Sequence, residues 1–140
     1  MSAGPLARLR RASAGRRRLL VAATVLLVRA SAVVALLPFR FSIRFGCVPL
    51  RDRRQVAVED IAWAIETAAQ LLPWRVVCIE KGLAGQRMLR AAGANAILHY
   101  GARHTVENAR LEAHVWVTVD DHAVIGGEEA HGFAAVATYP

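Results

Sequence analysis

The chain has 140 residues, of which 55% are hydrophobic, and a formal net charge of +7. This length accommodates one domain plus an extension. Its two cysteines, Cys47 and Cys78, cannot define a disulfide framework, and with the histidines they match no known zinc-ligand spacing. We therefore expect a reducing compartment, no metal and no cofactor.

The charge is divided unevenly along the chain. Residues 1–54 hold twelve arginines and one acid, Asp52, for a charge of +11, whereas residues 55–140 hold six basic and ten acidic residues, for −4. A domain that binds nucleic acid is typically basic where it makes contact. Because the net positive charge is confined to the N-terminal third, the composition argues against a nucleic-acid partner. Within that third, residues 1–18 predict a flexible or surface-lying basic segment.

Residues 19–39 form the most apolar stretch, and three interpretations compete. A transmembrane helix fits the length of about 20 residues, but Arg29 lies at its centre, where an unpaired charge is costly. A signal peptide fits the apolar run at residues 19–28 after a basic run, with a cleavage-like sequence at residues 30–32. The third interpretation is a helix that packs on its own domain or on a partner and ends at Pro38. We favour the third, since the missing disulfide framework argues against export.

The next two segments predict a connection and then a helix. Residues 39–50 alternate apolar residues with Arg or Ser, which predicts a short strand or an extended linker. Cys47 lies there with no histidine nearby in the sequence, and we interpret it as structural. After a polar break, residues 56–72 predict an amphipathic helix, with Glu59 and Asp60 in its first turn to match the helix dipole.

Residues 71–93, LLPWRVVCIEKGLAGQRMLRAAG, place Cys78 at the start of a second helix that ends near Gly93. The first N–H groups of a helix are unpaired, and its dipole is positive there. Both favour the thiolate, the reactive form of cysteine, and the same N–H groups can bind a developing oxyanion. A buried cysteine is usually only a small hydrophobic residue, so this position alone does not establish a nucleophile.

The last third predicts short extended pieces in an antiparallel arrangement. They are a strand at residues 94–100, a polar loop at 101–110, a strand with alternating faces at 111–119, a turn at 120–122, a partner strand at 123–125, a break at Gly126-Gly127 and an extended piece at 133–139.

Among the histidines, His114 is singled out by its neighbour Trp116, which shares its strand face, so that this face is not simply solvated. His99, in mid-strand, is the closest rival. His104 lies in the predicted loop and His122 in the predicted turn, where a solvated side chain is the usual state.

A Cys–His pair needs a third group that fixes the imidazole tautomer. If the chain turns at residues 120–122, His114 lies opposite residues 127–129, within reach of Glu128 or Glu129. Asp120 is further along the same strand, about 20 Å away at ~3.3 Å per residue. Geometry therefore favours a glutamate, and Glu112, on the same strand face, is a weaker candidate.

These stretches resemble the transglutaminase-like cysteine proteases of lasso peptide biosynthesis, known as leader peptidases or B proteins. The resemblance rests on AWA, LPWRVVCIEKGLAGQRMLRAAG, ILHYGA and LEAHVWVTVDDHAVIGG, followed by a tail of Phe, Ala and Val. It covers about residues 56–140, and the apolar, Arg-punctuated helix that ends in Leu-Pro-Phe is also similar. The resemblance thus favours the third interpretation of residues 19–39.

The resemblance implies a papain/transglutaminase-like α+β core, with helices packed on a small antiparallel sheet and an N-terminal apolar helix. The expected organisation is a basic segment at 1–18, the apolar helix and linker at 19–55, and the protease domain at 56–140. By motif, Cys78 is the nucleophile and His114 the general base. The acid of the family is usually aspartate, and here Glu128 is the first choice, with Glu129 and Asp120 as alternatives. The amide of Gln70 is a weaker candidate for a second oxyanion donor.

The reaction implied by the resemblance is removal of the leader from a ribosomally synthesised precursor peptide, before a macrocyclase of the asparagine-synthetase type closes the ring. The chain resembles the stand-alone protease form, which implies a separate leader-binding, winged-helix-like recognition protein as a partner. We expect a cytoplasmic location, and contact of residues 19–39 with a membrane surface stays open. An acyltransferase on the same fold and a non-catalytic peptide-binding scaffold remain as alternatives.

Overall fold

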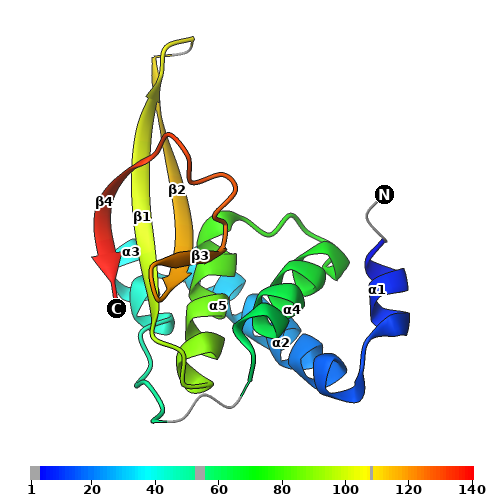
Figure 1. Ribbon diagram of the computed structural model, residues 1–140. Helices are drawn as coiled ribbons and strands as arrows, with labels where there is room; N and C mark the ends of the chain where they lie inside the picture. The colour runs from blue at the N-terminus through cyan, green and yellow to red at the C-terminus, as the bar shows by residue number, and fades with distance from the viewer. Residues whose placement is uncertain (1–3, 53–55, 108) are drawn as a thin grey trace.

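The structure is a computed structural model that describes residues 4–52, 56–107 and 109–140. Within these residues, helices pack together and against an antiparallel sheet of four strands (Figure 1). The α+β class predicted from the sequence is confirmed. The described residues stop on either side of positions 53–55, so part of the predicted polar break, at the end of the predicted segment 19–55, lies outside them.

Two helices occupy the basic N-terminal region. Helix α1 (Pro5–Arg11) lies on the surface and has no buried residue, and α2 (Ala14–Leu36) begins after Ser13, whose hydroxyl accepts the Arg16 N–H at 3.3 Å. The structure therefore has regular helices in the segment for which the sequence predicts a flexible or surface-lying chain.

Helix α2 packs on its own domain, as the third interpretation predicted. Its buried side chains, which face α4 and α5, are Leu20, Ala23, Leu27 and Ala30. By length and composition α2 could also cross a membrane, since its mean hydropathy is 2.4, and only 22% of that apolar window is buried. Its other side is therefore left exposed.

Residues 39–45 are helical, so the prediction of a short strand or extended linker at residues 39–50 was wrong for this part, whereas residues 47–50 have no regular secondary structure. Helix α3 (Phe39–Ser42) runs directly into a short 3₁₀ helix, η1 (Ile43–Phe45). The carbonyl of Pro38 accepts the N–H of Ser42 at 3.0 Å, and the Ser42 hydroxyl donates to the carbonyls of Val33 and Leu37 at 3.2 Å each. These local hydrogen bonds satisfy backbone groups that an isolated strand would leave unpaired.

Helices α4 (Val58–Leu71) and α5 (Cys78–Ala91) confirm the two predicted amphipathic helices. Arg16 ties the start of α2 to α4, because its guanidinium contacts the Asp60 carboxylate at 2.8 Å and lies 4.9 Å from the centre of the Trp63 ring. Gly93 follows α5 with a φ of 89°, a conformation that favours glycine at a helix end.

The sheet has the strand order β3-β2-β1-β4, with neighbouring strands antiparallel. Its strands are β1 (Ala96–Thr105), β2 (Arg110–Val119), β3 (His122–Ile125) and β4 (Ala134–Tyr139). The turn from β2 to β3 lies where it was predicted, and Val115, Val117 and Val119 form the buried face of β2.

The polar loop predicted at residues 101–110 was wrong in its extent. Strand β1 continues to Thr105 and β2 begins at Arg110, so that His104 pairs with Leu111 inside the ladder. Polar side chains on these ends are satisfied across the strands, as in the ion pair between Arg103 and Glu112 at 2.8 Å. The polar composition of this stretch thus reflects the exposed end of a long hairpin, not a loop.

Helix α5 lies close against the sheet and is tied to it by Gln86. A Cβ on Gly82 would lie 2.7 Å from a methyl carbon of Val115, so only glycine permits this approach. Gln86 is fully buried, and its amide nitrogen donates to the carbonyl of Tyr139 at 2.7 Å and to that of Ala96 at 3.4 Å. These bonds connect α5 to the end of β4 and the beginning of β1.

We expect Gln86→Leu to lower the free energy of unfolding by about 1–3 kcal/mol, because the carbonyls of Ala96 and Tyr139 lose their donor, that of Ala96 in a buried position. Urea denaturation followed by circular dichroism measures the change. Gln70→Leu is the matched control, since Gln70 is an exposed glutamine on α4 and should change stability little. Equal urea midpoints of unfolding for the two variants would contradict the role of Gln86 in tying α5 to the sheet.

Candidate active site

Cys78 is the first residue of α5, and a buried carboxylate fixes the beginning of this helix. The N–H of Val77, immediately before the helix, donates to Oε2 of Glu80 at 2.9 Å. Glu80 is only 9% exposed and occupies the third helical position, from which a glutamate commonly reaches back to the cap. The Cys78 thiol is half-buried at the positive end of the helix dipole. Its own N–H is among those that a helix leaves without an intrahelical partner.

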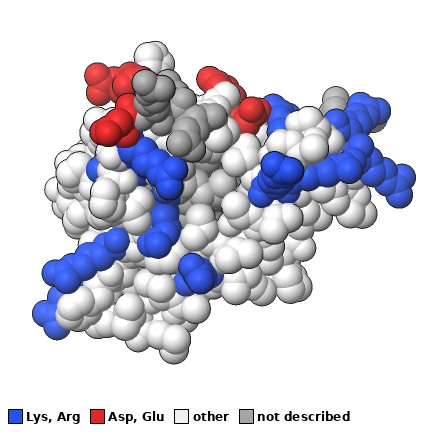
Figure 2. All heavy atoms as spheres, turned by 90° about the horizontal axis from the view of Figure 1, so that it is seen from below, with Lys and Arg blue, Asp and Glu red and all other residues white. Residues whose placement is uncertain are grey.

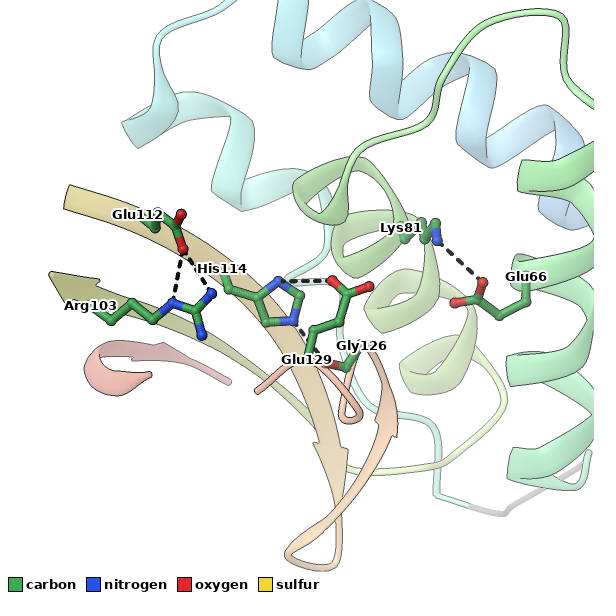
Figure 3. Close-up of polar contacts among 7 residues, drawn as sticks. All are labelled: Glu66, Lys81, Arg103, Glu112, His114, Gly126 and Glu129. Atoms are coloured by element: carbon green, nitrogen blue, oxygen red, sulfur yellow. Dashed lines mark hydrogen bonds and ion pairs between the residues drawn. The ribbon is translucent and has the colours of Figure 1, made fainter. Parts of the chain in front are cut away.

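His114 lies on β2, and one ring nitrogen is held by the backbone. Its side chain is buried, and Nε2 lies 2.8 Å from the carbonyl oxygen of Gly126 (Figure 3). A carbonyl oxygen can only accept, so Nε2 donates the proton in this bond. In the neutral ring Nδ1 is then unprotonated, which makes Nδ1 the atom that can act as a base.

Aromatic rings hold the His114 imidazole in place. The ring of Trp116 is stacked at 6.0 Å with an interplanar angle of 17°, and that of Phe133 lies at 5.3 Å with an angle of 40°. Arg103 lies over Phe133, with the guanidinium carbon 4.4 Å from the ring centre. His99 continues the stack on Trp116 at 5.4 Å. The predicted sharing of one strand face by His114 and Trp116 thus positions the imidazole by packing.

The acids predicted as the third catalytic group, beside Cys78 and His114, lie at different places. Oε2 of Glu129 lies 3.9 Å from Nδ1 of His114, and its side chain is 80% exposed. This distance is beyond a hydrogen bond, and an exposed ion pair of this kind is weak. Glu128 lines the same cleft, but no hydrogen bond or ion pair joins it to His114 among the described residues. Asp120 lies in the turn at the far end of β2, with a φ of 50°.

The carbonyl of Gly126 is a positioning group that the sequence did not reveal. Gly126 has a φ of 71°, and a Cβ there would lie 2.9 Å from the carbonyl oxygen of Val115 and 3.4 Å from Nε2 of His114. Both the backbone conformation and the space therefore require glycine. The sequence marks Gly126-Gly127 as a strand break, but every residue has a carbonyl, so no side-chain pattern identifies this acceptor.

Most of the predicted site residues line one open cleft of about 1420 Å³. Cys78 and His114 both line it, as do Gln70, Glu128 and Glu129. The cleft also contains a second histidine, His131, which the sequence gave no reason to select. Its charged lining residues are balanced in sign: Arg8, Arg75, Lys81 and Arg103, and Glu66, Glu112, Glu128 and Glu129.

An ion pair joins the two helices at the wall of this cleft. Nζ of Lys81 on α5 lies 3.2 Å from the carboxylate of Glu66 on α4, as Figure 3 shows. Because α4 also carries Gln70, this contact helps to fix the position of Gln70 relative to the start of α5.

The other cysteine and the rival histidine lie outside the cleft lining. Cys47 donates its thiol to the carbonyl of Ile43 at 3.3 Å, and partial burial of the thiol raises its pKa, with the charge of Arg90 acting in the opposite direction. Burial lowers the pKa of His99, against the effect of Asp121, and its Nε2 lies 2.8 Å from the Thr118 hydroxyl. Across the described residues, no three His, Cys, Asp or Glu side chains are grouped to hold a metal ion.

Comparison with known proteins gives one family. No curated protein and no solved structure matches the chain. The sequence family described as the transglutaminase-like superfamily matches residues 21–138, from inside α2 into β4. The matched region includes α5, the hairpin with His114 and the cleft between them, and it confirms the predicted fold. Since the match covers most of the sequence, the chain belongs to the transglutaminase-like superfamily.

Proposed function

We propose that this chain is a cysteine peptidase that removes the leader from a ribosomally synthesised lasso precursor peptide, before a macrocyclase closes the ring. The observation that carries the peptidase assignment is the single cleft lined by Cys78, at a helix N-terminus, and by the buried, oriented His114. Membership of the transglutaminase-like superfamily supports thiol-dependent acyl chemistry. The lasso precursor as substrate rests on the resemblance of the Cys78 and His114 segments to leader peptidases.

In the proposed first step, Nδ1 of His114 accepts the thiol proton and the thiolate of Cys78 attacks the scissile carbonyl carbon. The carbonyl π electrons move to oxygen, and the N–H of Cys78, at the positive end of α5, stabilises the resulting oxyanion. The side-chain amide of Gln70, on the same cleft, is the proposed second donor. The Gly126 carbonyl keeps Nε2 as a donor throughout, so that the proton always moves through Nδ1.

In the second half of the cycle, the imidazolium gives its Nδ1 proton to the leaving amine as the C–N bond breaks. A thioester remains on Cys78. Nδ1 then takes a proton from water, which attacks the thioester, and returns it to the thiolate when the carboxylate product leaves. The Glu129 carboxylate, 3.9 Å from Nδ1, favours the imidazolium that forms transiently, although its exposure limits this effect.

The dimensions of the cleft support a peptide as the substrate. Its volume of about 1420 Å³ exceeds the ~300–1,000 Å³ that is usual for small-molecule pockets. Its mixed charges favour no strongly acidic or strongly basic ligand. In this proposal a separate winged-helix-like recognition protein binds the leader, the macrocyclase receives the freed core peptide, and the reaction takes place in the cytoplasm.

We expect Cys78→Ala to abolish cleavage and to leave the fold intact, because it removes only a half-buried thiol at the helix start. The purified chain is incubated with a candidate precursor peptide encoded near its gene and with the leader-binding partner, and the masses of the products are measured. Cys47→Ala is the matched control and should cleave normally, since Cys47 does not line the cleft.

Cleavage that survives Cys78→Ala would overturn the nucleophile assignment. Transfer of the acyl group to an amine in place of water would identify the chain as an acyltransferase. Peptide binding by the folded chain without any product would identify it as a scaffold.

We expect Gly126→Ala to reduce the cleavage rate by about 10²-fold, because a Cβ near His114 Nε2 displaces the ring or its acceptor carbonyl. Gly93→Ala is the matched control. Gly93 also has a positive φ, so alanine strains the backbone there by a similar amount, but it lies at the far end of α5. Thermal melting shows whether each variant remains folded. Equal rates for the two folded variants would contradict the role of Gly126 in positioning His114.

A further inference from the structure

The outward side of α2 is apolar along most of its length. Val21, Val25, Val28 and Leu36 are exposed, with values from 43% for Val28 to 81% for Leu36, and their spacing puts them on one helical face. From Val21 to Leu36 this face extends about 22 Å at 1.5 Å per residue. The opposite face is buried against α4 and α5.

Three more exposed apolar side chains follow the helix end in the sequence. Leu37, Phe39 and Phe41 are each more than two-fifths exposed. We define the outer α2 face by these side chains together with the four exposed ones of α2: Val21, Val25, Val28, Leu36, Leu37, Phe39 and Phe41.

The elements that carry this face contribute only positive charge. Residues 1–51 contain no Asp or Glu, so α1, α2, α3 and η1 carry arginine as their only charged residue. Exposed Arg18 lies near the beginning of the outer α2 face and exposed Arg29 beside its middle. At the other end, Arg40 and Arg44 lie over the ring of Phe41, at 4.7 and 5.9 Å. In Figure 2, which views the molecule from below, acidic side chains are confined to the upper edge and arginine and lysine lie around uncharged surface.

We propose that the outer α2 face binds the surface of an anionic lipid bilayer, with α2 lying flat in the interface. The exposed apolar side chains can enter the boundary between headgroups and acyl chains while the flanking arginines meet anionic headgroups, and these two contributions together hold a helix in the interface. Long arginine side chains can keep their charges at the lipid headgroups while their stems cover apolar surface. Each arginine near an anionic surface strengthens binding roughly fivefold.

The packing of α2 favours this arrangement over a spanning helix. To cross a bilayer, α2 would have to leave α4 and α5 and expose the core that Leu20, Ala23, Leu27 and Ala30 now cover. An acidic protein surface would satisfy the arginines but would leave the long aliphatic stripe between them without an apolar partner. None of the residues lining the active-site cleft belongs to α2, so the bound chain would keep the cleft accessible. The proposal therefore adds a location to the peptidase function and does not depend on it.

The test is co-sedimentation of the full chain with vesicles of phosphatidylcholine alone or mixed with phosphatidylglycerol. We expect binding to the mixed vesicles that weakens as salt is added, and weak binding to phosphatidylcholine alone. The triple variant Val21→Gln, Val25→Gln, Val28→Gln should bind mixed vesicles at least about tenfold less. Arg18→Gln with Arg29→Gln should lower binding to mixed vesicles by about tenfold or more and leave binding to phosphatidylcholine unchanged.

The matched control carries the same number of Val or Leu to Gln changes in the β1–β2 hairpin and β4. Val106, Leu111 and Val136 are 99%, 65% and 65% exposed, and their replacement should leave vesicle binding within about twofold of the original. Circular dichroism establishes that every variant is folded.

Three results would overturn the proposal. The first is a folded chain that does not bind mixed vesicles. If such a chain forms a dimer that the α2 triple variant converts to a monomer, the outer α2 face is a dimer interface instead. The second is an equal loss of binding in the α2 and sheet triple variants. The third is a chain that alkaline carbonate cannot extract from membranes, which would show that α2 spans the bilayer. Peptide cleavage is measured without vesicles, so none of these results decides the proposed peptidase activity.

Discussion

The close packing of α5 against the sheet is the contact on which the rest of the structure depends. Helix α5 begins at Cys78, approaches Val115 through the missing side chain of Gly82, and is tied to β4 by Gln86. A shift of this helix along the sheet would move Cys78 relative to His114, since His114 is the immediate neighbour of Val115 on β2. The same glycine that permits dense packing therefore also sets the geometry of the cleft.

The orientation of His114 depends more on backbone and rings than on an acid. In many Cys–His sites a side chain accepts the second imidazole proton and fixes the tautomer. Here the acceptor within hydrogen-bond distance is the Gly126 carbonyl, and Trp116 and Phe133 enclose the ring. A neutral acceptor fixes the tautomer as well as a carboxylate does, but it stabilises the imidazolium less.

Helices with regularly spaced apolar residues were predictable from the sequence, whereas structure that depends on individual hydrogen bonds was not. The helices around Ile61 and Leu83 follow from apolar spacing, and the Cys78 and His114 assignments follow from local motifs and from the resemblance. The helical segment after Pro38 was missed because alternating Arg and Phe imitate a strand, whereas hydrogen bonds of Ser42 to the end of α2 stabilise a helix. The length of β1 was missed because polar residues of an exposed hairpin have a loop-like composition. The Gly126 carbonyl has no signature in the sequence at all.

The central claim is that Cys78 and His114 form one reactive pair. The most direct test measures the alkylation rate of Cys78 by iodoacetamide across the neutral pH range, in a Cys47→Ala background, with and without His114→Ala. His99→Ala is the control, because His99 stacks on Trp116 but does not line the cleft. Our account predicts rapid alkylation at neutral pH that His114→Ala slows severalfold and His99→Ala leaves nearly unchanged. Slow alkylation in the Cys47→Ala protein and in both of its histidine variants would contradict it, and so would the same rate with and without His114.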